Sequence, residues 1–199
     1  QYEGQLTYLV STERADYYYH LEGGGFASII DNEGHDWLSY HAEVGSFERG
    51  EYRGIPNMDV SREGISTGSF HPGDHAVTTT LVGHGPLKVT FRSVYDNPLY
   101  RWSILWEIYP TFMRMTVEEA GADNAGNYWL LYEGTPGGSL DTGDVVVTSD
   151  GSSSSAADNA EQWMTVMTDP QWLYYLDTAG SRYLFLSDDN GDDSPDAHR

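Results

Sequence analysis

The sequence predicts an all-β fold, an antiparallel β-sandwich with little helix. Short segments rich in valine, threonine and aromatic residues recur along the chain, and clusters of glycine, proline, asparagine and aspartate separate them. No segment shows the hydrophobic period of a long amphipathic helix. Many short strands with turn residues between them are typical of an antiparallel sandwich or barrel.

The expected strands follow from the alternation of apolar and polar residues. Alternation is clearest in residues 87–95, where Leu87, Val89 and Phe91 face one side and the residues between them face the other. Segments of this kind lie at residues 5–12, 26–31, 35–40, 75–83, 87–95, 101–110, 111–120, 127–134, 144–150, 171–178 and 182–189.

Turn residues divide these strands. The cluster at residues 32–34 predicts a hairpin, and Pro110 separates two further strands. One short helix is expected within residues 152–167, where serines precede Ala-Ala-Asp. By alternation, the residues expected in the core are Leu87, Val89, Phe91, Ile104, Trp106, Met113 and Met115.

A chain of 199 residues fits one domain and is long enough for a sizeable core. We expect a β-sandwich domain over residues 1–187 and an acidic C-terminal segment over residues 188–199. The absence of cysteine excludes disulfides, thiolate metal sites and cysteine nucleophiles. The chain begins at Gln1 without a Met or a signal-like stretch, so we expect that a targeting segment has been removed or lies outside this sequence.

The charge balance narrows the classes of partner. The chain has 31 acidic residues against 10 Lys and Arg, a formal net charge of -21. Such a surface repels nucleic acid and anionic membranes, so neither is expected as a partner. No run approaches the roughly 20 apolar residues that cross a bilayer. An acidic ligand would need a local positive site.

Several stretches resemble a known group of proteins. The Gly-Gly-Phe-x-Ser-Ile-x-Asp opening, "GPLKVTFRS" and "WSILWEIYPTFMRMTVE" are similar to the large antiparallel sandwiches of carbohydrate-active enzymes. Galactose-mutarotase-like domains and several polysaccharide lyase families share that architecture. The stretches "EYRGIPN", "FHPG" and "YWLLYEGTPGG" resemble secreted bacterial proteins of polysaccharide breakdown. The resemblance covers residues 23–138 and implies a secreted protein that acts on a polysaccharide.

Two loops carry candidate catalytic and binding residues. In "GEYRGIPN", Arg53 offers a planar fork of donors suited to a carboxylate, and Tyr52 adds an aromatic face. The alternative is that Arg53 pairs with a neighbouring acid. In "SFHPGDH", His71 and His75 flank a Pro-Gly turn, which suits a base or, with Asp74, a metal site. The alternative is a plain surface loop.

Two further segments carry candidate carboxylates. Glu133 ends a strand beside Trp129, where a raised pKa would suit an acid or base, and Glu107 is a similar strand carboxylate. The alternative is that Glu133 pairs with an arginine. Asp188, Asn190 and Asp192 resemble part of a calcium loop, so calcium is the one cofactor considered. A solvated acidic tail is the stronger interpretation, because the glycine is misplaced and the final glutamate is missing.

Three functions fit these patterns. In a polysaccharide lyase, Arg53 or Arg92 would neutralise the substrate carboxylate, and His71, His75 or Tyr52 would remove the adjacent proton. A non-catalytic carbohydrate-binding module would instead present a platform of stacking aromatics. A structural subunit of an extracellular assembly would self-associate through exposed aromatics and sheet edges. The lyase acting on an acidic polysaccharide is the favoured hypothesis.

Overall fold

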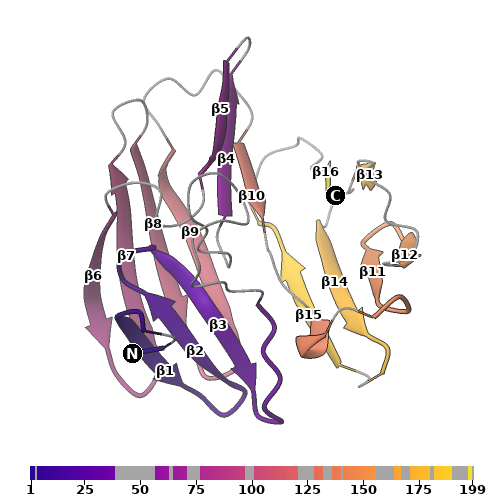
Figure 1. Cartoon of the computed structure of the whole chain (residues 1–199), viewed down its shortest axis with the longest axis horizontal. Helices are drawn as coiled ribbons and strands as arrows, with labels where there is room; N and C mark the ends of the chain where they lie inside the picture. Colours follow the sequence, from indigo (N-terminus) through magenta and orange to yellow (C-terminus); the bar gives the residue numbers. More distant parts are fainter. Residues whose placement is uncertain are drawn as a thin grey trace. The chain divides into compact units, whose positions relative to one another are not determined.

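The computed structural model is built almost entirely of antiparallel strands (Figure 1). Its described residues are 1–2, 4–38, 57–62, 65–70, 77–96, 101–120, 128–131, 136–139, 141–155, 164–166, 171–179, 182–189 and 197–198. Within them the only helical turn is η1 (Pro136–Gly138), which confirms the predicted all-β class. No helix there has the length and apolar character needed to cross a membrane. The chain divides into two compact units, Gln1–Gly134 and Thr135–Arg199.

Unit 1 contains three antiparallel sheets. The first has the order β1 (Thr7–Ser11), β2 (Ala15–His20), β3 (Gly25–Asp31). The second has the order β6 (Val77–His84), β7 (Val89–Asp96), β8 (Arg101–Ile108), β9 (Met113–Ala120). The third has the order β10 (Tyr128–Leu131), β4 (Asn57–Arg62), β5 (Ile65–Phe70). The predicted strand break at Pro110 is confirmed, because it falls between β8 and β9.

The hairpin predicted after β3 is present as a tight reversal. The Asp31 carboxylate accepts the backbone N–H groups of Glu33 and His35, at 3.0 and 2.9 Å. Gly34 supplies the positive φ of 92° that the turn requires. The returning chain then pairs with β3, because Trp37 N–H donates to the Ile29 carbonyl at 2.9 Å.

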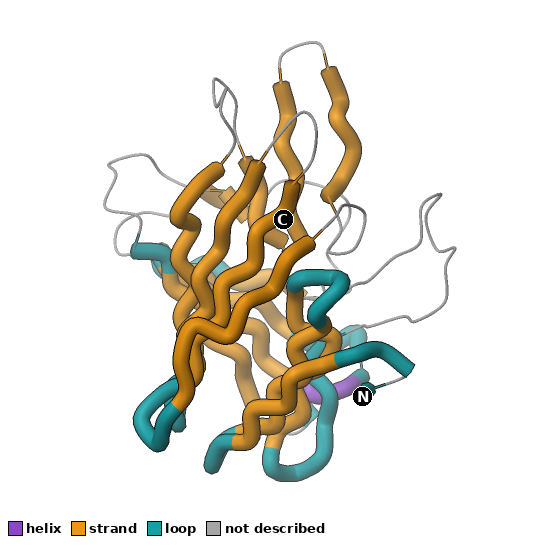
Figure 2. Tube along the Cα trace, turned by 90° about the vertical axis from the view of Figure 1, so that its left-hand side faces the viewer, coloured by secondary structure: helices purple, strands orange, loops and turns teal. Residues whose placement is uncertain are grey.

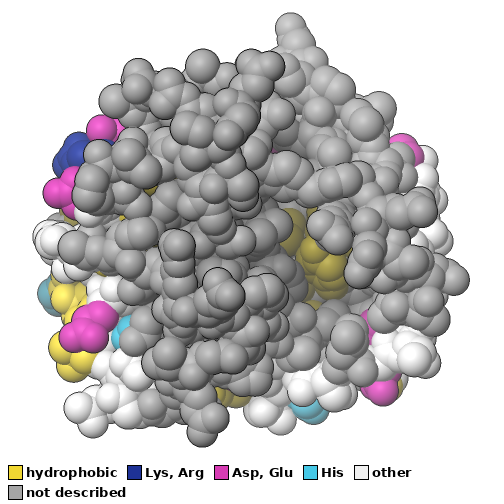
Figure 3. Space-filling model, turned by 45° about the horizontal axis from the view of Figure 1, so that its top comes forward, with side chains coloured by type: hydrophobic (Ala, Val, Ile, Leu, Met, Phe, Trp, Pro, Cys, Tyr) yellow, Lys and Arg dark blue, Asp and Glu magenta, His cyan; other side chains and the backbone are white. Residues whose placement is uncertain are grey.

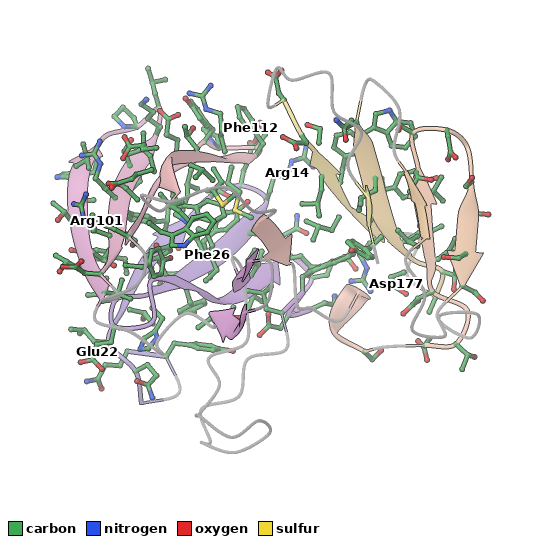
Figure 4. The ribbon with its side chains drawn as sticks, turned by 90° about the horizontal axis from the view of Figure 1, so that it is seen from above. Arg14, Glu22, Phe26, Arg101, Phe112 and Asp177 are labelled. Atoms are coloured by element: carbon green, nitrogen blue, oxygen red, sulfur yellow. The ribbon has the colours of Figure 1, made fainter. Side chains whose placement is uncertain are left out.

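The core of unit 1 consists of aromatic rings between the first and second sheets, which lie face to face in Figures 1 and 2. From β7, Phe91 packs against Tyr8 and Tyr19 of the first sheet, with centroid distances of 5.5 and 4.8 Å. Phe26, which is labelled in Figure 4, meets Trp106 of β8 edge to face at 4.8 Å. These contacts make the pair of sheets a sandwich.

Hydrogen bonds also join the two sheets of the sandwich. The buried Tyr19 hydroxyl donates to the Gly24 carbonyl at 2.9 Å and hydrogen-bonds with Ser93 of β7 at 2.6 Å. Thr79 of β6 donates to the Leu21 carbonyl at 3.1 Å. The buried hydroxyls therefore have partners, as a dry interface between sheets requires.

The predicted core is confirmed at Phe91, Ile104 and Trp106, which are buried. Val89 is half-buried, as are the two predicted methionines of β9. The prediction was wrong at Leu87, whose side chain is 78% exposed. Leu87 lies in the turn before β7, so the alternation of that strand does not extend to it.

Unit 2 contains a four-stranded antiparallel sheet and a short two-stranded one. The larger has the order β12 (Ser153–Ser155), β11 (Val145–Thr148), β14 (Trp172–Asp177), β15 (Arg182–Ser187). The smaller pairs β13 (Met164–Val166) with β16 (Ala197–His198). The helix predicted within residues 152–167 is wrong at both ends of that segment, where β12 and β13 lie. The predicted acidic segment begins where β15 ends, and that boundary stays a prediction.

Candidate functional site

The larger sheet of unit 2 presents a row of rings, here called the aromatic face: Trp172, Tyr174, Tyr183 and Phe185. Trp172 and Tyr174 come from β14, and Tyr183 and Phe185 come from β15. Tyr174 pairs directly with Phe185 across the two strands. Directly paired residues of antiparallel strands project from the same side of a sheet, so the rings share one surface.

The rings of the aromatic face are arranged at close and regular spacing. Trp172 and Tyr174 are stacked, with centroids 6.1 Å apart and planes 7° from parallel. Phe185 lies 5.9 Å from Trp172 with an interplanar angle of 30°. Tyr183 lies 5.8 Å from Tyr174 and is tilted by 60°. Tyr174 and Phe185 therefore both stack against Trp172, and the fourth ring, Tyr183, is tilted relative to Tyr174.

The aromatic face is the more exposed side of these strands, although Trp172 and Tyr174 are half-buried. Tyr183 and Phe185 are 65% and 51% exposed. Leu173 and Asp177, which alternate with the rings of β14, are buried. Side chains alternate between the two faces of a strand, so these buried residues and the exposed rings of β15 lie on opposite sides of the sheet.

Small and polar residues border the aromatic face. The register places Val147 of β11 opposite Tyr174, and Ser153 of β12 opposite Val147. At the other edge, Ser187 pairs with Trp172. The rings thus stand above their neighbours and have hydroxyl groups on two sides. A flat ligand with an apolar face and polar edges would meet both kinds of group.

None of the four residues of the aromatic face was among the site residues predicted from the sequence. The signal was present in "QWLYYLDT" and "RYLFLSDD", where alternate positions carry rings. Alternation alone does not say which face of a strand is covered, so the rings could equally have belonged to a core.

Most of the predicted site residues lie outside the described residues. These are Tyr52, Arg53, His71, His75, Glu133, Asn190 and Asp192. Trp129 lies in β10, where its backbone pairs with Asp59 of β4. The structure describes only the backbone of Trp129. The predicted catalytic and metal-binding roles of these residues stay predictions.

Arg92, predicted to bind substrate, is bound to a carboxylate of the protein. Its guanidinium donates to both carboxylate oxygens of Glu118, at 2.6 and 2.7 Å. Ser103 also donates to Glu118, at 3.0 Å. Hydrogen bonds from Arg92 and Ser103 hold the pKa of Glu118 below its usual value. A substrate carboxylate would have to displace Glu118 to gain the two-pronged contact.

Glu107 is held as a carboxylate by two cations. Lys88, which directly precedes β7, and Arg114 of β9 both donate hydrogen bonds to the Glu107 carboxylate. Their hydrogen bonds, that of Lys88 first, lower the pKa of Glu107 to about 2. Lys88 also lies 5.7 Å from the centroid of the Tyr109 ring. A general acid needs a raised pKa, so this environment does not suit Glu107 to that role.

Ion pairs of this kind recur among the described basic side chains. Lys88, Arg92, Arg101, Arg114 and Arg182 each pair with an aspartate or glutamate. On the face drawn in Figure 3, dark blue atoms lie directly beside magenta ones. The scarce positive charges of the described part of the chain are therefore largely neutralised within the protein itself.

A pocket in unit 1 lies beside the turn between β6 and β7. Its lining includes Glu13, Leu87, Lys88 and Tyr109, and its volume is 290 Å³. That volume is at the lower limit of typical small-molecule pockets. Because Lys88 already pairs with Glu107, this pocket offers an anionic ligand little free positive charge.

Asp188, the one predicted calcium ligand that is described, is exposed beyond β15. Its backbone N–H donates to the Gln171 carbonyl at 3.0 Å. The proposed partners Asn190 and Asp192 lie outside the described residues, so the calcium loop stays a prediction.

Comparison with known proteins returned no matching family model, no matching curated protein and no matching solved structure. The chemistry of the described residues is therefore the basis for assigning a function.

Proposed function

We propose that this protein binds polysaccharide through the aromatic face of unit 2. The observation that carries the proposal is the row of Trp172, Tyr174 and Phe185 at spacings near 6 Å, in which Phe185 is exposed and the other two rings are half-buried. Fixed rings on neighbouring strands lose little conformational freedom when a ligand stacks on them.

The chemistry of a sugar fits this surface. A pyranose ring has a flat face of C–H groups and a rim of hydroxyls. Tyrosine and tryptophan match both features, because each has an apolar ring face and a polar edge. The hydroxyls of Ser153, Ser155 and Ser187 stand on the same side of the sheet and would serve as hydrogen-bond partners.

A nucleic acid fits the surface less well. Bases also stack on rows of aromatic side chains, but such sites combine the rings with a positive groove for the phosphates. Arg182 belongs to the strand that carries Tyr183 and Phe185, and it pairs with Asp177. With a net charge of -21, the chain repels a polyanion. The same reasoning favours a neutral polysaccharide over an acidic one at this face.

Binding, rather than cleavage, is the function that the described residues support. The lyase hypothesis depends on Tyr52, Arg53, His71 and His75, and it remains a separate proposal. A secreted location agrees with a polysaccharide ligand, since such polymers are abundant outside cells, and it is proposed on that ground.

The test compares single ring truncations. Phe185→Ala and Tyr183→Ala remove exposed rings, so both variants should fold. Phe112→Ala is the matched control, because Phe112 is 55% exposed and lies in unit 1. Binding is measured by affinity electrophoresis and calorimetry against a panel of neutral and uronic-acid polysaccharides.

We expect each unit 2 truncation to weaken binding by about tenfold or more, as loss of a ring that stacks on a flat ligand does. Phe112→Ala should leave binding unchanged. If all three variants bind as the parent does, the aromatic face is not the glycan site. If no polymer binds, and Phe185→Ala instead abolishes a dimer seen in ultracentrifugation, the face is a protein interface. Release of unsaturated sugar from a uronic-acid polymer would separately support a lyase.

A further inference from the structure

A second cluster of functional groups lies at one end of the larger sheet of unit 2. Asp144 directly precedes β11, and Asp177 is the last residue of β14. The register pairs Val145 with Leu176, which brings the two aspartates to neighbouring positions at this end. Asp177 is labelled in Figure 4. One carboxylate oxygen from each of Asp141, Asp144 and Asp177 lies within 4.8 Å of the others.

The loop before β11 fixes two of these aspartates against each other. Asp141 N–H donates to Oδ2 of Asp144 at 2.8 Å, and Asp144 N–H donates to the Asp141 carbonyl at 3.0 Å. This reciprocal pair of hydrogen bonds ties the backbone of Asp141 to the backbone and side chain of Asp144 at the start of the strand. The Asp141 side chain is exposed, so the cluster is accessible from solvent.

Asp144 is the member of the cluster that requires a ligand. Its side chain is only 3% exposed. Its Oδ1 atom is buried and has no hydrogen-bond partner among the described residues. A buried polar atom without a partner is rare in folded proteins, and an ionised one is especially unfavourable. Here the unpartnered carboxylate belongs to a group with two further carboxylates beside it, which is an arrangement that suits a bound cation.

Asp177 is positioned by three separate contacts. Its Oδ1 accepts Ala179 N–H at 3.0 Å, and its Oδ2 accepts from Arg182 at 3.1 Å. The backbone of Gly137 in η1 packs so closely on this carboxylate that a Cβ at residue 137 would overlap with Oδ2. The cluster thus combines three carboxylates with one guanidinium, and a divalent cation would reduce the repulsion among the carboxylates.

We propose that Asp141, Asp144 and Asp177 bind one Ca²⁺ ion. Calcium takes oxygen ligands at about 2.3–2.6 Å, so two ligands on opposite sides of one ion are up to about 5 Å apart. The carboxylate oxygens of the cluster already lie within that span. The ligand set contains only oxygen, which favours a hard cation over zinc or copper.

The bound ion would act as a structural cross-link. Asp141 and Asp144 belong to the loop before β11, Asp177 ends β14, and η1 rests against Asp177. One ion would therefore join segments that are far apart in the sequence. This site is separate from the residues 188–192 that the sequence analysis considered for calcium.

The experiment measures calcium binding by calorimetry and by thermal unfolding of the full chain at constant ionic strength. Parallel titrations with Mg²⁺ separate a specific site from screening of the acidic surface. The variants are Asp141→Asn, Asp144→Asn and, as the control, Asp188→Asn. Asp141→Asn alters an exposed side chain, so it tests the site even if Asp144→Asn fails to fold.

We expect one Ca²⁺ per chain and a rise in Tm of about 5–10 °C at a hundredfold excess over Kd. Asp141→Asn and Asp144→Asn should each weaken calcium binding by about 10- to 100-fold, as removal of ligands and their supports does in metal sites. Asp188→Asn should bind as the parent does.

Three results would overturn the proposal. Equal effects of Ca²⁺ and Mg²⁺ that no variant alters would show screening only. Loss of binding in Asp188→Asn alone would move the site to the C-terminal segment. If calcium leaves the Tm of the parent unchanged and calorimetry shows no binding, the cluster holds no calcium ion.

Discussion

Replacement of Phe91 by alanine tests the packing of the sandwich in unit 1. Phe91 is fully buried, with 0% exposure, and β7 lies between β6 and β8 in its sheet. A central strand cannot easily shift to fill a cavity. Phe91→Ala should therefore lower the free energy of unfolding by about 3–5 kcal/mol, the range for truncation of a buried phenylalanine. Taking about 4 kcal/mol and a slope of about 2 kcal/mol per molar urea, the unfolding midpoint should fall by about 2 M.

The control for this experiment is Leu87→Ala. Residues 87 and 91 fall on the same face by alternation, but Leu87 is 78% exposed in its turn. Its truncation should change the free energy of unfolding by no more than about 0.5 kcal/mol. Urea unfolding followed by tryptophan fluorescence measures both variants. A loss below about 1 kcal/mol for Phe91→Ala, or an equal loss for Leu87→Ala, would refute the assignment of the core.

A double-mutant cycle extends the test to the contact between the sheets. Tyr8 of β1 stacks on Phe91 with an interplanar angle of 8°. Removing both rings should therefore differ from the sum of the single losses by about 0.5–1.5 kcal/mol. Strict additivity would mean that β1 does not pack on β7 in solution.

Two further predictions concern single residues. Glu107, whose pKa is lowered to about 2 by hydrogen bonds from Lys88 and a neighbouring arginine, stabilises the fold above its unfolded pKa of about 4.3. That contribution to the free energy of unfolding is lost as the pH falls from about 4.3 through about 2. Glu107→Gln should therefore weaken the dependence of stability on pH in this range. An unchanged dependence would count against the ion pairs. Gly137→Ala should lower the Tm more than Gly151→Ala does: both residues have positive φ, but only at residue 137 would a Cβ overlap with Asp177. Equal losses would show that this close approach is absent.

The strands and turns of the described chain could be predicted from sequence because their signals are local. Alternation in residues 89–95 and the proline at residue 110 each act within a few residues of themselves. The same signals failed at Leu87, where the pattern ran past the end of the strand into a turn. They also missed β4 and β5, and they missed β2, whose three consecutive tyrosines alternate between buried and half-buried positions although the residue type does not change.

The tertiary structure decided which groups meet and which face of each strand is covered. The sequence shows that Trp172, Tyr174, Tyr183 and Phe185 lie on alternate positions, but only the packed sheet shows that this face is open. Arg92 of β7 pairs with Glu118 of β9, which is 26 residues away, because the sheet places only β8 between these two strands.

The sequence by itself therefore determined the class of fold, through hydrophobic periodicity and turn residues. Only the tertiary structure brought Asp144 to Asp177, because the pairing of β11 with β14 sets their distance. The physical reason is that the side-chain period within a strand is a local property, whereas strand register and burial depend on partners far along the chain. Candidate sites made by such pairings have no signature in any single stretch of sequence.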